Sequence, residues 1–257
     1  MRFKSLGSGS TGNATVVQST GAGAPCTLLI DCGFGLKQLS ARLEKSGLRA
    51  EDVTAIFITH EHGDHTGCAQ ALSSKYGIPM WMSAGTFSAV AFDNAAGLIK
   101  LASDGQAIDL GSLQITPFTV PHDARAPLQL TCTDGNAKFG VLTDLGHATD
   151  HVLHHLKNCN ALLLECNHDA DMLGASSYPE FLKQRVGGDH GHLSNAQAAA
   201  IAQTVQHEQL RQVVAAHLSQ QNNLPALAAQ ALAKALSCSL DDIMVASADD
   251  GCPWMGV

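Results

Sequence analysis

Apolar runs and amphipathic segments alternate along the chain, and their spacing predicts a series of strands and helices. Leu36, Leu39 and Leu43 recur at helical spacing, so we expect residues 35–46 to form an amphipathic helix. Residues 113–118 alternate between apolar and polar side chains, as a half-buried strand does. Short continuous apolar runs are typical of strands buried on both faces. Such runs occupy residues 28–30, 55–59, 139–143, 161–164, 213–216 and 243–246.

Two helices are expected in the second half of the chain. Ser194 can cap a helix over 195–206, and Pro225 opens an Ala/Leu-rich helix that extends to about residue 236. Helices and strands interleave throughout, and no linker, charge block or short repeat divides the sequence. This interleaving favours one layered α/β domain, residues 1–257, over two joined pieces.

The composition narrows the class of protein. The chain has 257 residues, of which 45% are hydrophobic and 15% charged, which is typical of a globular protein. Fifteen Lys and Arg against 23 Asp and Glu give a net charge of −8. That balance argues against a broad basic face that tracks nucleic acid, and the 5% aromatic content argues against a processive grip on it. A local site for an anionic substrate stays open.

The sequence also bears on location. It contains no apolar run of the ~18 residues that a transmembrane helix needs, and its start lacks the apolar segment of a signal peptide. The eight cysteines form no C-x-x-C pair, so we expect reduced thiols. We therefore expect a cytoplasmic protein without a membrane partner, while the oligomeric state stays open.

Thirteen histidines are the unusual feature of the composition, and the densest group follows an expected strand. Residues 60–65 read H-E-H-G-D-H. In an extended chain residues two apart point the same way, so His60 and His62 can converge on one ion. The glycine allows a sharp turn, after which Asp64 and His65 can project toward a second ion. Imidazole and carboxylate ligands suit zinc or another borderline divalent metal, and a solvated polar loop is the alternative.

This motif resembles the H-x-H-x-D-H motif of the metallo-β-lactamase superfamily, and the resemblance runs over nearly the whole chain. It implies a four-layer αββα sandwich with a dinuclear metal site at one edge. It also implies three further ligands in chain order, which His122, Asp144 and His217 match, each after an expected strand. By the resemblance one metal takes His60, His62 and His122, the other takes Asp64, His65 and His217, and Asp144 bridges the two.

The resemblance implies two divalent ions as cofactors. Zinc is the expected metal, and manganese or iron would fit the same ligands. Because the ligands include only two carboxylates, two divalent ions would leave the loaded site positive. A phosphodiester or a carboxylate could therefore dock in an acidic protein that has no Lys/Arg patch.

Further segments resemble the YycJ-like bacterial nucleases and related phosphodiesterases within this superfamily. Residues 5–13 are similar to the Gly/Ser opening of that branch, where Asn13 is a candidate site residue. Redox members with di-iron sites carry Glu at the position of His62, so the resemblance points away from them. The other matching segments are L-E-C-N-H-D at 164–169, H-G-H-L-S-N at 190–195, H-D-A at 122–124 and H-L-S at 217–219.

The resemblance also suggests a proton donor. Related transfer-RNA processing nucleases pair a carboxylate with a histidine that protonates the leaving oxygen, and Glu165 and His192 match that pair. A carboxylate on one ring nitrogen fixes the tautomer and raises the imidazole pKa. The alternative is that His192 anchors the loop before a helix and Glu165 caps a strand. Asp64 would orient the nucleophile besides binding metal, and Asp31 is expected to hold the metal loop from below.

Several other histidines have no assigned role. His151, His154 and His155 fall at helical spacing and are interpreted as a solvated helix face. His147 lies close to Asp144 in sequence, which leaves a substrate-recognition edge open for it. The roles of His168 and His190 stay open, with His190 interpreted as a neighbour of the site.

The sequence thus predicts a metal-dependent hydrolase that cleaves a phosphodiester with a metal-bridging hydroxide, as a DNA or RNA exonuclease-like enzyme does. A small or cyclic phosphodiester is an alternative substrate. Thioester or lactone hydrolysis of the glyoxalase II type is a second alternative. The third is a metal-stabilised binding module without turnover.

Overall fold

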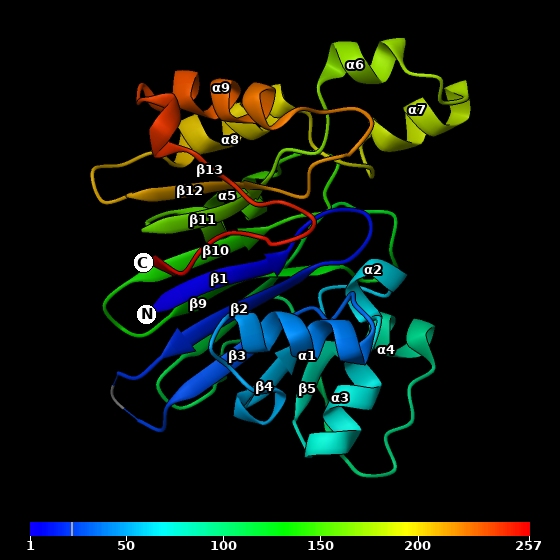
Figure 1. Ribbon diagram of the computed structural model, residues 1–257, viewed down its shortest axis with the longest axis vertical. Helices are drawn as coiled ribbons and strands as arrows, with labels where there is room; N and C mark the ends of the chain where they lie inside the picture. The colour runs from blue at the N-terminus through cyan, green and yellow to red at the C-terminus, as the bar shows by residue number, and fades with distance from the viewer. Residues whose placement is uncertain (22) are drawn as a thin grey trace.

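The computed structural model describes residues 1–21 and 23–257. In this part of the chain the strands form two stacked seven-stranded sheets (Figure 1). The first sheet runs, in spatial order, β14 (Met255–Gly256), β1 (Arg2–Gly7), β2 (Ala14–Ser19), β3 (Cys26–Ile30), β4 (Ala55–Phe57), β5 (Met80–Ser83) and β6 (Ile99–Ala102).

The second sheet is the counterpart of the first. It runs β13 (Met244–Val245), β12 (Gln212–Ala216), β11 (Ala161–Glu165), β10 (Lys138–Leu142), β9 (Leu128–Thr133), β8 (Gln114–Thr119) and β7 (Ile108–Asp109). Strands β3 to β6 pair in parallel, and so do β10 to β13. The carboxyl ends of parallel strands meet at one edge of each sheet, and loops at such an edge commonly carry the functional side chains.

Helices cover the outer faces of the two sheets (Figure 1). On the side of the first sheet lie α1 (Leu36–Lys45), α2 (Gly63–Thr66), α3 (Ala69–Tyr76) and α4 (Ala84–Val90). On the side of the second lie α5 (Asp150–Leu156), α8 (Asn195–Val205) and α9 (Pro225–Leu236), while α6 (Ala170–Ala175) and α7 (Glu180–Val186) project beyond them. Within the described residues, no helix has the length and apolar character needed to cross a membrane.

Three apolar layers hold the four structural layers together. Leu28 and Ile30 of β3 belong to the layer between the sheets, whereas Leu29 belongs to the layer beneath α1, with Leu39 and Leu43. The third layer joins the second sheet to α5, α8 and α9. Because both faces of the central strands are buried, their sequences read as continuous apolar runs. The predicted αββα sandwich is confirmed.

Most predicted elements are present at nearly the predicted bounds. The expected helix at 35–46 is α1, and the expected helix at 195–206 is α8. Ser194 caps α8 as predicted, since its side chain accepts a hydrogen bond from the backbone N–H of Gln197. The expected helix after Pro225 is α9, and each expected strand lies within a few residues of its predicted range.

Candidate metal centre

The H-E-H-G-D-H segment leaves β4 at the carboxyl edge of the first sheet, and α2 begins inside it. Asp31, just after β3, lies beneath this loop. Its Oδ1 accepts the backbone N–H of Thr59 at 2.9 Å, and its Oδ2 lies 2.8 Å from Nδ1 of His65. The expectation that Asp31 supports the metal loop is confirmed by these contacts.

The Gly/Ser loop between β1 and β2 packs against the same segment. The backbone N–H of Asn13 donates to the carbonyl of Asp64 at 2.8 Å, and Nδ2 of Asn13 lies 3.3 Å from Oδ2 of Asp64. Gly33 lies between them, and a Cβ there would collide with the backbone of Asp64. The structure therefore places Asn13 at the site, and it requires a glycine at position 33.

The second sheet delivers its polar residues from strand ends. His122 follows β8, Asp144 follows β10, Glu165 ends β11 and His217 follows β12. Asp144 and His217 adopt left-handed backbone conformations, with φ of 56° and 54°, and Asp31 does so at 61°. This conformation costs a residue with a Cβ roughly 1–2 kcal/mol, and it persists where the surrounding fold imposes it.

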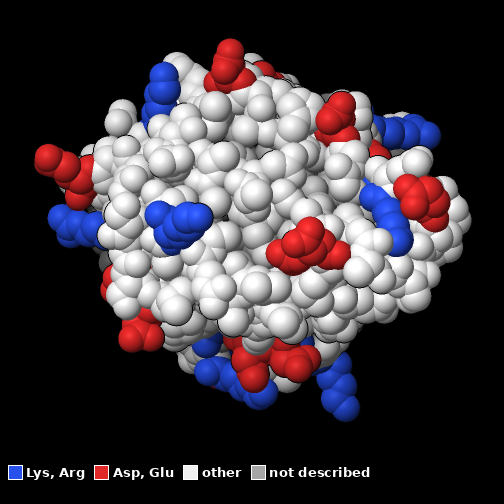
Figure 2. Space-filling model, turned by 90° about the horizontal axis from the view of Figure 1, so that it is seen from above, with Lys and Arg blue, Asp and Glu red and all other residues white. Residues whose placement is uncertain are grey.

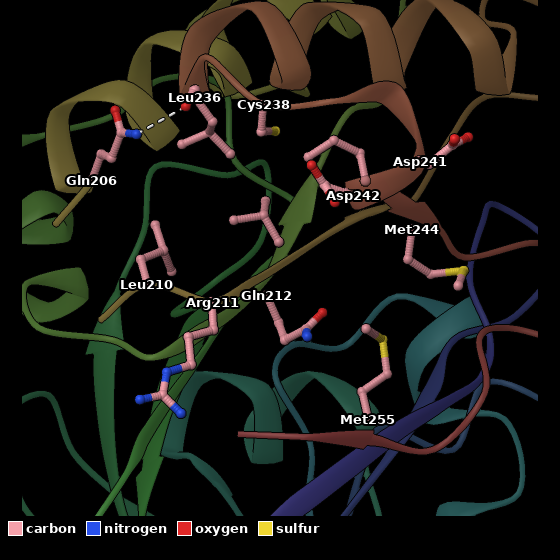
Figure 3. Close-up of a pocket in the computed structure, with 12 residues that line it drawn as sticks. Gln206, Leu210, Arg211, Gln212, Leu236, Cys238, Asp241, Asp242, Met244 and Met255 are labelled. Atoms are coloured by element: carbon pink, nitrogen blue, oxygen red, sulfur yellow. Dashed lines mark hydrogen bonds between the residues drawn. The ribbon is translucent and has the colours of Figure 1, made fainter. Parts of the chain in front are cut away.

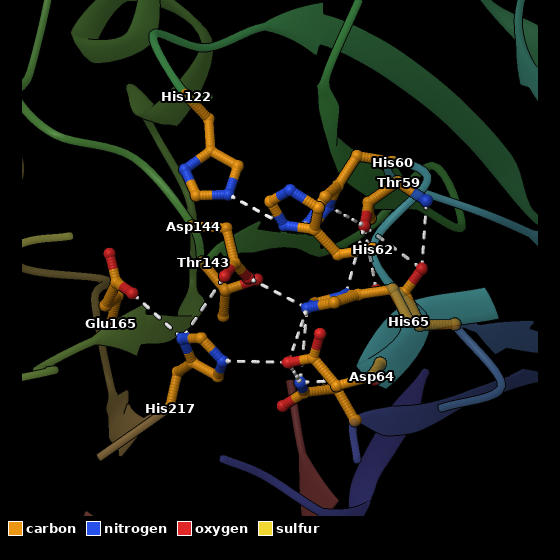
Figure 4. Close-up of polar contacts among 12 residues, drawn as sticks. Thr59, His60, His62, Asp64, His65, His122, Thr143, Asp144, Glu165 and His217 are labelled. Carbon is orange, nitrogen blue, oxygen red and sulfur yellow. Dashed lines mark hydrogen bonds and ion pairs between the residues drawn. The ribbon is translucent and has the colours of Figure 1, made fainter. Parts of the chain in front are cut away.

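Three imidazoles form the first group of converging side chains (Figure 4). Nε2 of His60 lies 3.0 Å from Nδ1 of His62, and Nε2 of His122 lies 3.4 Å from the same atom. Ring nitrogens this close need a shared proton or a cation between them. The structure thus brings together the three residues predicted for one metal.

Asp64, His65 and His217 form the second group (Figure 4). Nε2 of His65 lies 3.6 Å from Oδ2 of Asp64, and Nε2 of His217 lies 3.8 Å from the same oxygen. Asp144 lies between the groups, because its Oδ2 is 3.3 Å from Nε2 of His65 and it also clusters with His60. This position suits the bridging role that the sequence suggested for Asp144.

Four of the five histidines are anchored through Nδ1, which leaves Nε2 directed at the centre. When Nδ1 carries the proton and donates to the protein, Nε2 keeps the lone pair that a metal needs. Such anchors orient metal-binding imidazoles in known metalloproteins. The Nδ1 partners are Thr59 Oγ1 for His60, Asp31 Oδ2 for His65, the Gly191 carbonyl for His122 and Glu165 Oε1 for His217.

Two buried atoms at the centre have no hydrogen-bond partner among the described residues. They are Oδ2 of Asp144 and Nε2 of His217. Buried polar atoms are nearly always paired, so each orphan needs an explanation. A cation between them would satisfy both, and the oxygen and nitrogen donors suit a divalent metal. The residues present therefore fit a metal site.

The charges of the cluster point the same way. Burial lowers the pKa of His65, but Asp144 and Asp31 outweigh burial and raise it to about 9. The pKa of His217 is also raised, because Asp144, Asp64 and Glu165 outweigh burial. The carboxylates thus stabilise positive charge here, which a divalent ion would supply in place of protons. His60 differs, since burial and the neighbouring imidazoles lower its pKa and keep it neutral.

Glu165 and His192 form the predicted pair. Oε1 of Glu165 accepts Nδ1–H of His192 at 2.8 Å, and Oε2 accepts the backbone N–H of Leu193 at 3.0 Å. Burial raises the pKa of Glu165, but His192 and His217 outweigh burial and lower it, so the buried carboxyl is ionised. Burial lowers the pKa of His192, and Glu165 raises it above its usual value. Glu165 therefore favours the charged form of His192, and Nε2 is free of this contact.

A cavity of 310 Å³ opens onto the cluster, and α7 forms one of its walls. Leu182 and Arg185 of α7 line it together with His192. Nε of Arg185 donates to Oδ2 of Asp123 at 2.7 Å, and Oδ1 of Asp123 lies 3.4 Å from Nε2 of His122. The sequence did not indicate Arg185, which lies in no motif. Asp123 lies in the H-D-A segment at 122–124, but the sequence assigned it no role.

The remaining histidines lie outside this lining. Nδ1 of His147 donates to the carbonyl of Asp189 at 2.9 Å. His168 is buried behind the site, and His190 is exposed, as expected of a neighbour. The interpretation of α5 as a solvated face holds for His154, whereas His155 stacks on Phe118.

A different cavity, of 460 Å³, lies between the α8–α9 pair and β12 (Figure 3). Arg211, Cys238 and Asp242 are among the residues that line it, with apolar side chains such as Leu236. It adjoins the start of β12 at Gln212, whereas His217 follows the end of that strand. None of the potential metal-binding groups found among the described residues lies there, so this cavity is not the metal centre.

Known proteins are similar to this chain in sequence and in fold. Residues 27–218 match the family described as "Beta-lactamase superfamily domain". The chain is 32% identical over 241 residues to "Exodeoxyribonuclease YycJ" of Bacillus anthracis, covering 92% of this chain and 89% of that protein. It is also 32% identical over 234 residues to "Exodeoxyribonuclease WalJ" of Streptococcus pneumoniae, covering 88% and 85%.

Among solved structures, the metallo-β-lactamase fold protein YhfI of Bacillus subtilis superposes with a TM-score of 0.74 at 18% identity. The match covers 99% of this chain and 98% of that one, and at this identity it shows the fold. The chain therefore belongs to the metallo-β-lactamase superfamily, and its relatives named as exodeoxyribonucleases are metal-dependent hydrolases of that superfamily. Its His/Asp cluster is compatible with that chemistry.

Proposed function

We propose that this protein is a metal-dependent exodeoxyribonuclease that hydrolyses phosphodiester bonds at the end of a DNA strand. The observation that carries the proposal is the single cavity in which His192 and Arg185 face the His/Asp cluster. The 32% sequence identity to two proteins named as exodeoxyribonucleases, over most of the chain, supports DNA as the substrate. The geometry of the site would also accept other phosphodiesters, and the test below distinguishes them from DNA.

Seven residues would hold two divalent ions, in the groups that the structure brings together. His60, His62 and His122 would bind one ion and Asp64, His65 and His217 the other, with Asp144 shared. Zinc suits this donor set, and manganese or iron fits it as well. When bound, such ions lower the pKa of a coordinated water and neutralise phosphoryl oxygens.

The protein's own residues complete the reaction. Glu165 holds Nδ1–H of His192 and favours its protonated form, so Nε2 would deliver a proton to the departing 3′-alkoxide of the strand. Oδ2 of Asp64 accepts from Asn13 and so has a fixed direction toward the cavity, where it orients the attacking water. Arg185 provides a cation at the cavity wall for a substrate phosphate.

The shape of the site favours the end of a strand. At 310 Å³ the cavity lies at the small end of the range of ligand pockets, about 300–1,000 Å³. Helix α7 also carries Phe181, which is 72% exposed and could stack on a base beside the cavity. Figure 2 shows Lys and Arg scattered singly over the face at the top of Figure 1, without a continuous basic stripe. With the net charge of −8, this suggests that local contacts at α7 would hold the substrate.

The test is cleavage of a 5′-phosphorylated DNA duplex by metal-loaded protein, with Asp64→Ala as the control for contaminating nuclease. We expect a ladder of products that shortens from one end with the parent protein and no ladder with the variant. Internal cleavage would replace the exonuclease proposal with an endonuclease. Metal-dependent hydrolysis of thioesters, lactones or cyclic phosphodiesters, with intact DNA, would overturn it.

A further inference from the structure

A second group of metal-ligating side chains lies away from the candidate metal centre. Asp104 occupies the turn between β6 and β7, and His151 and His155 lie one turn apart on α5. One ligand atom from each lies within 4.8 Å of the others. We propose that Asp104, His151 and His155 form an accessory site for a borderline divalent cation such as Zn²⁺.

The three side chains already face one another. Residues four apart on a helix share a face, and the rings of His151 and His155 have centroids 4.7 Å apart. Nε2 of His151 lies 2.8 Å from Oδ1 of Asp104. Two imidazoles and one carboxylate make a common donor set for zinc, with water in the fourth position.

Neighbouring residues restrain two of these ligands. The ring of Phe118 stacks on His155 with centroids 4.9 Å apart and an interplanar angle of 11°. Oδ1 of Asp104 accepts the backbone N–H of Thr119 at 2.8 Å. Both restraints come from β8, so the strand positions one ligand on α5 and one in the β6–β7 turn. Restrained ligands lose less side-chain entropy when an ion binds.

The pKa shifts of His155 and Asp104 favour the forms that bind a metal. Partial burial and the neighbouring His151 lower the pKa of His155, which favours its neutral form. Burial raises the pKa of Asp104, but the hydrogen bond from Thr119 and the contact with His151 outweigh burial and lower it. Lys138 is the nearby cation, and its Nζ is engaged by the carbonyls of His155 and Lys157.

The site is open to solvent and separate from the catalytic cavity. Asp104 and His151 line a surface depression of 460 Å³ with Thr119, Val120 and Pro121. No residue is shared between this lining and that of the catalytic cavity. A bound ion would tie α5 to the β6–β7 turn, beside the segment that leads into His122. The accessory ion would therefore stabilise this edge of the fold without entering the reaction.

The test counts zinc ions. Protein with its catalytic centre filled is titrated with Zn²⁺ against a chromophoric chelator, for the parent, His151→Ala, Asp104→Asn and the control His154→Ala. His154 is exposed on the same helix and outside the cluster. We expect the parent and His154→Ala to bind one more ion than the other two variants.

A second readout guards against misfolding. The side chains of His151 and Asp104 are each 42% exposed. Before Zn²⁺ is added, we therefore expect their variants to have the same Tm as the parent. Added Zn²⁺ should raise the Tm further in the parent and in His154→Ala than in His151→Ala, while DNA cleavage is unchanged. Equal numbers of ions in all four proteins would overturn the proposal, as would an equal loss in His154→Ala.

Discussion

The first sheet supplies four of the clustered side chains from six consecutive residues, whereas the second supplies its share from separate strand ends. His60, His62, Asp64 and His65 all lie in the loop after β4. His122, Asp144 and His217 are far apart in sequence and meet only because β8, β10 and β12 belong to one sheet. One half of the centre is thus encoded locally, and the other half is encoded by the fold.

The difference extends to the chemistry of the two halves. The first sheet contributes candidate metal ligands from the loop after β4, and the carboxylate of Asp31 after β3 that contacts this loop. The second sheet contributes ligands and, in addition, the Glu165–His192 pair and the cavity wall at Arg185. We therefore expect changes in the loop to act through the metal, and changes around the second sheet to separate metal binding from catalysis.

The largest effect is expected from the loop. Asp64→Ala removes a carboxylate from one metal group, and several kcal/mol of lost transition-state stabilisation correspond to a rate at least ~10³-fold lower. Metal content and cleavage of DNA should fall together, whereas the exposed Asp171→Ala on α6 should match the parent. An Asp64→Ala protein within tenfold of the parent would show that this loop is not part of the chemistry.

A change at His192, which pairs with Glu165 of the second sheet, should affect cleavage without affecting metal binding. His192→Ala should retain metal and cleave DNA ~10²–10⁴-fold more slowly, because the 3′-alkoxide leaves without a proton donor. Bis(p-nitrophenyl) phosphate should be hydrolysed at a rate much closer to that of the parent, since nitrophenolate leaves unprotonated. His147→Ala is the matched control. Equal losses on both substrates, together with lost metal, would make His192 a ligand.

The pH profile sharpens the same point. Glu165 outweighs burial and raises the pKa of His192, so the acid form persists to higher pH than in a free imidazole and is lost as pH rises through that raised pKa. The kcat of the parent on DNA should therefore fall on the alkaline side, and His192→Ala should lack this fall. A profile that is identical in both proteins would assign the alkaline limb to another group.

Asp31→Asn tests the support beneath the loop. The amide is nearly isosteric, but it cannot hold Nδ1–H of His65 as a carboxylate does. Loss of such a partner commonly weakens metal affinity by ~10–100-fold. Competition with a chelator should show this weakening, while Asp109→Asn on β7 should bind metal as the parent does. Unchanged affinity would mean that the loop orients its ligands without Asp31.

The smallest effect is expected at the cavity wall. Arg185 is 63% exposed at its side chain, and a solvent-exposed contact with a phosphate worth ~1 kcal/mol corresponds to about a fivefold higher KM. Arg185→Ala should therefore raise KM for DNA with little change in kcat, and Lys183→Ala on the same helix should change neither. A fall in kcat with constant KM would give Arg185 a role in the reaction itself.

The comparison of the two halves also explains what the sequence could predict. The 60–65 motif carries its spacing in six residues, and the buried strands are legible because continuous apolar runs reflect burial on both faces. The three distant ligands could be proposed only by resemblance, since a lone His or Asp after a strand is an ordinary polar residue. The fold brings them to the predicted groups.

Other features of the site had no signal in the sequence. Arg185 lines the cavity because α7 forms one of its walls, and nothing near it in sequence indicates that position. The Nδ1 contact between His122 and the carbonyl of Gly191 joins residues 69 apart. β9 was also not predicted, although its leucines alternate with Gln129 and Thr131 as in a half-buried strand. Both of those polar side chains are nevertheless buried.

The left-handed conformations of Asp31, Asp144 and His217 have a consequence for how this protein tolerates change. Glycine adopts that conformation without a steric penalty, so it would relieve backbone strain at all three positions. The same substitutions would remove a supporting carboxylate or a candidate ligand. Glycine would thus exchange backbone strain for lost buried contacts, and these three positions should be held fixed in any effort to stabilise the protein.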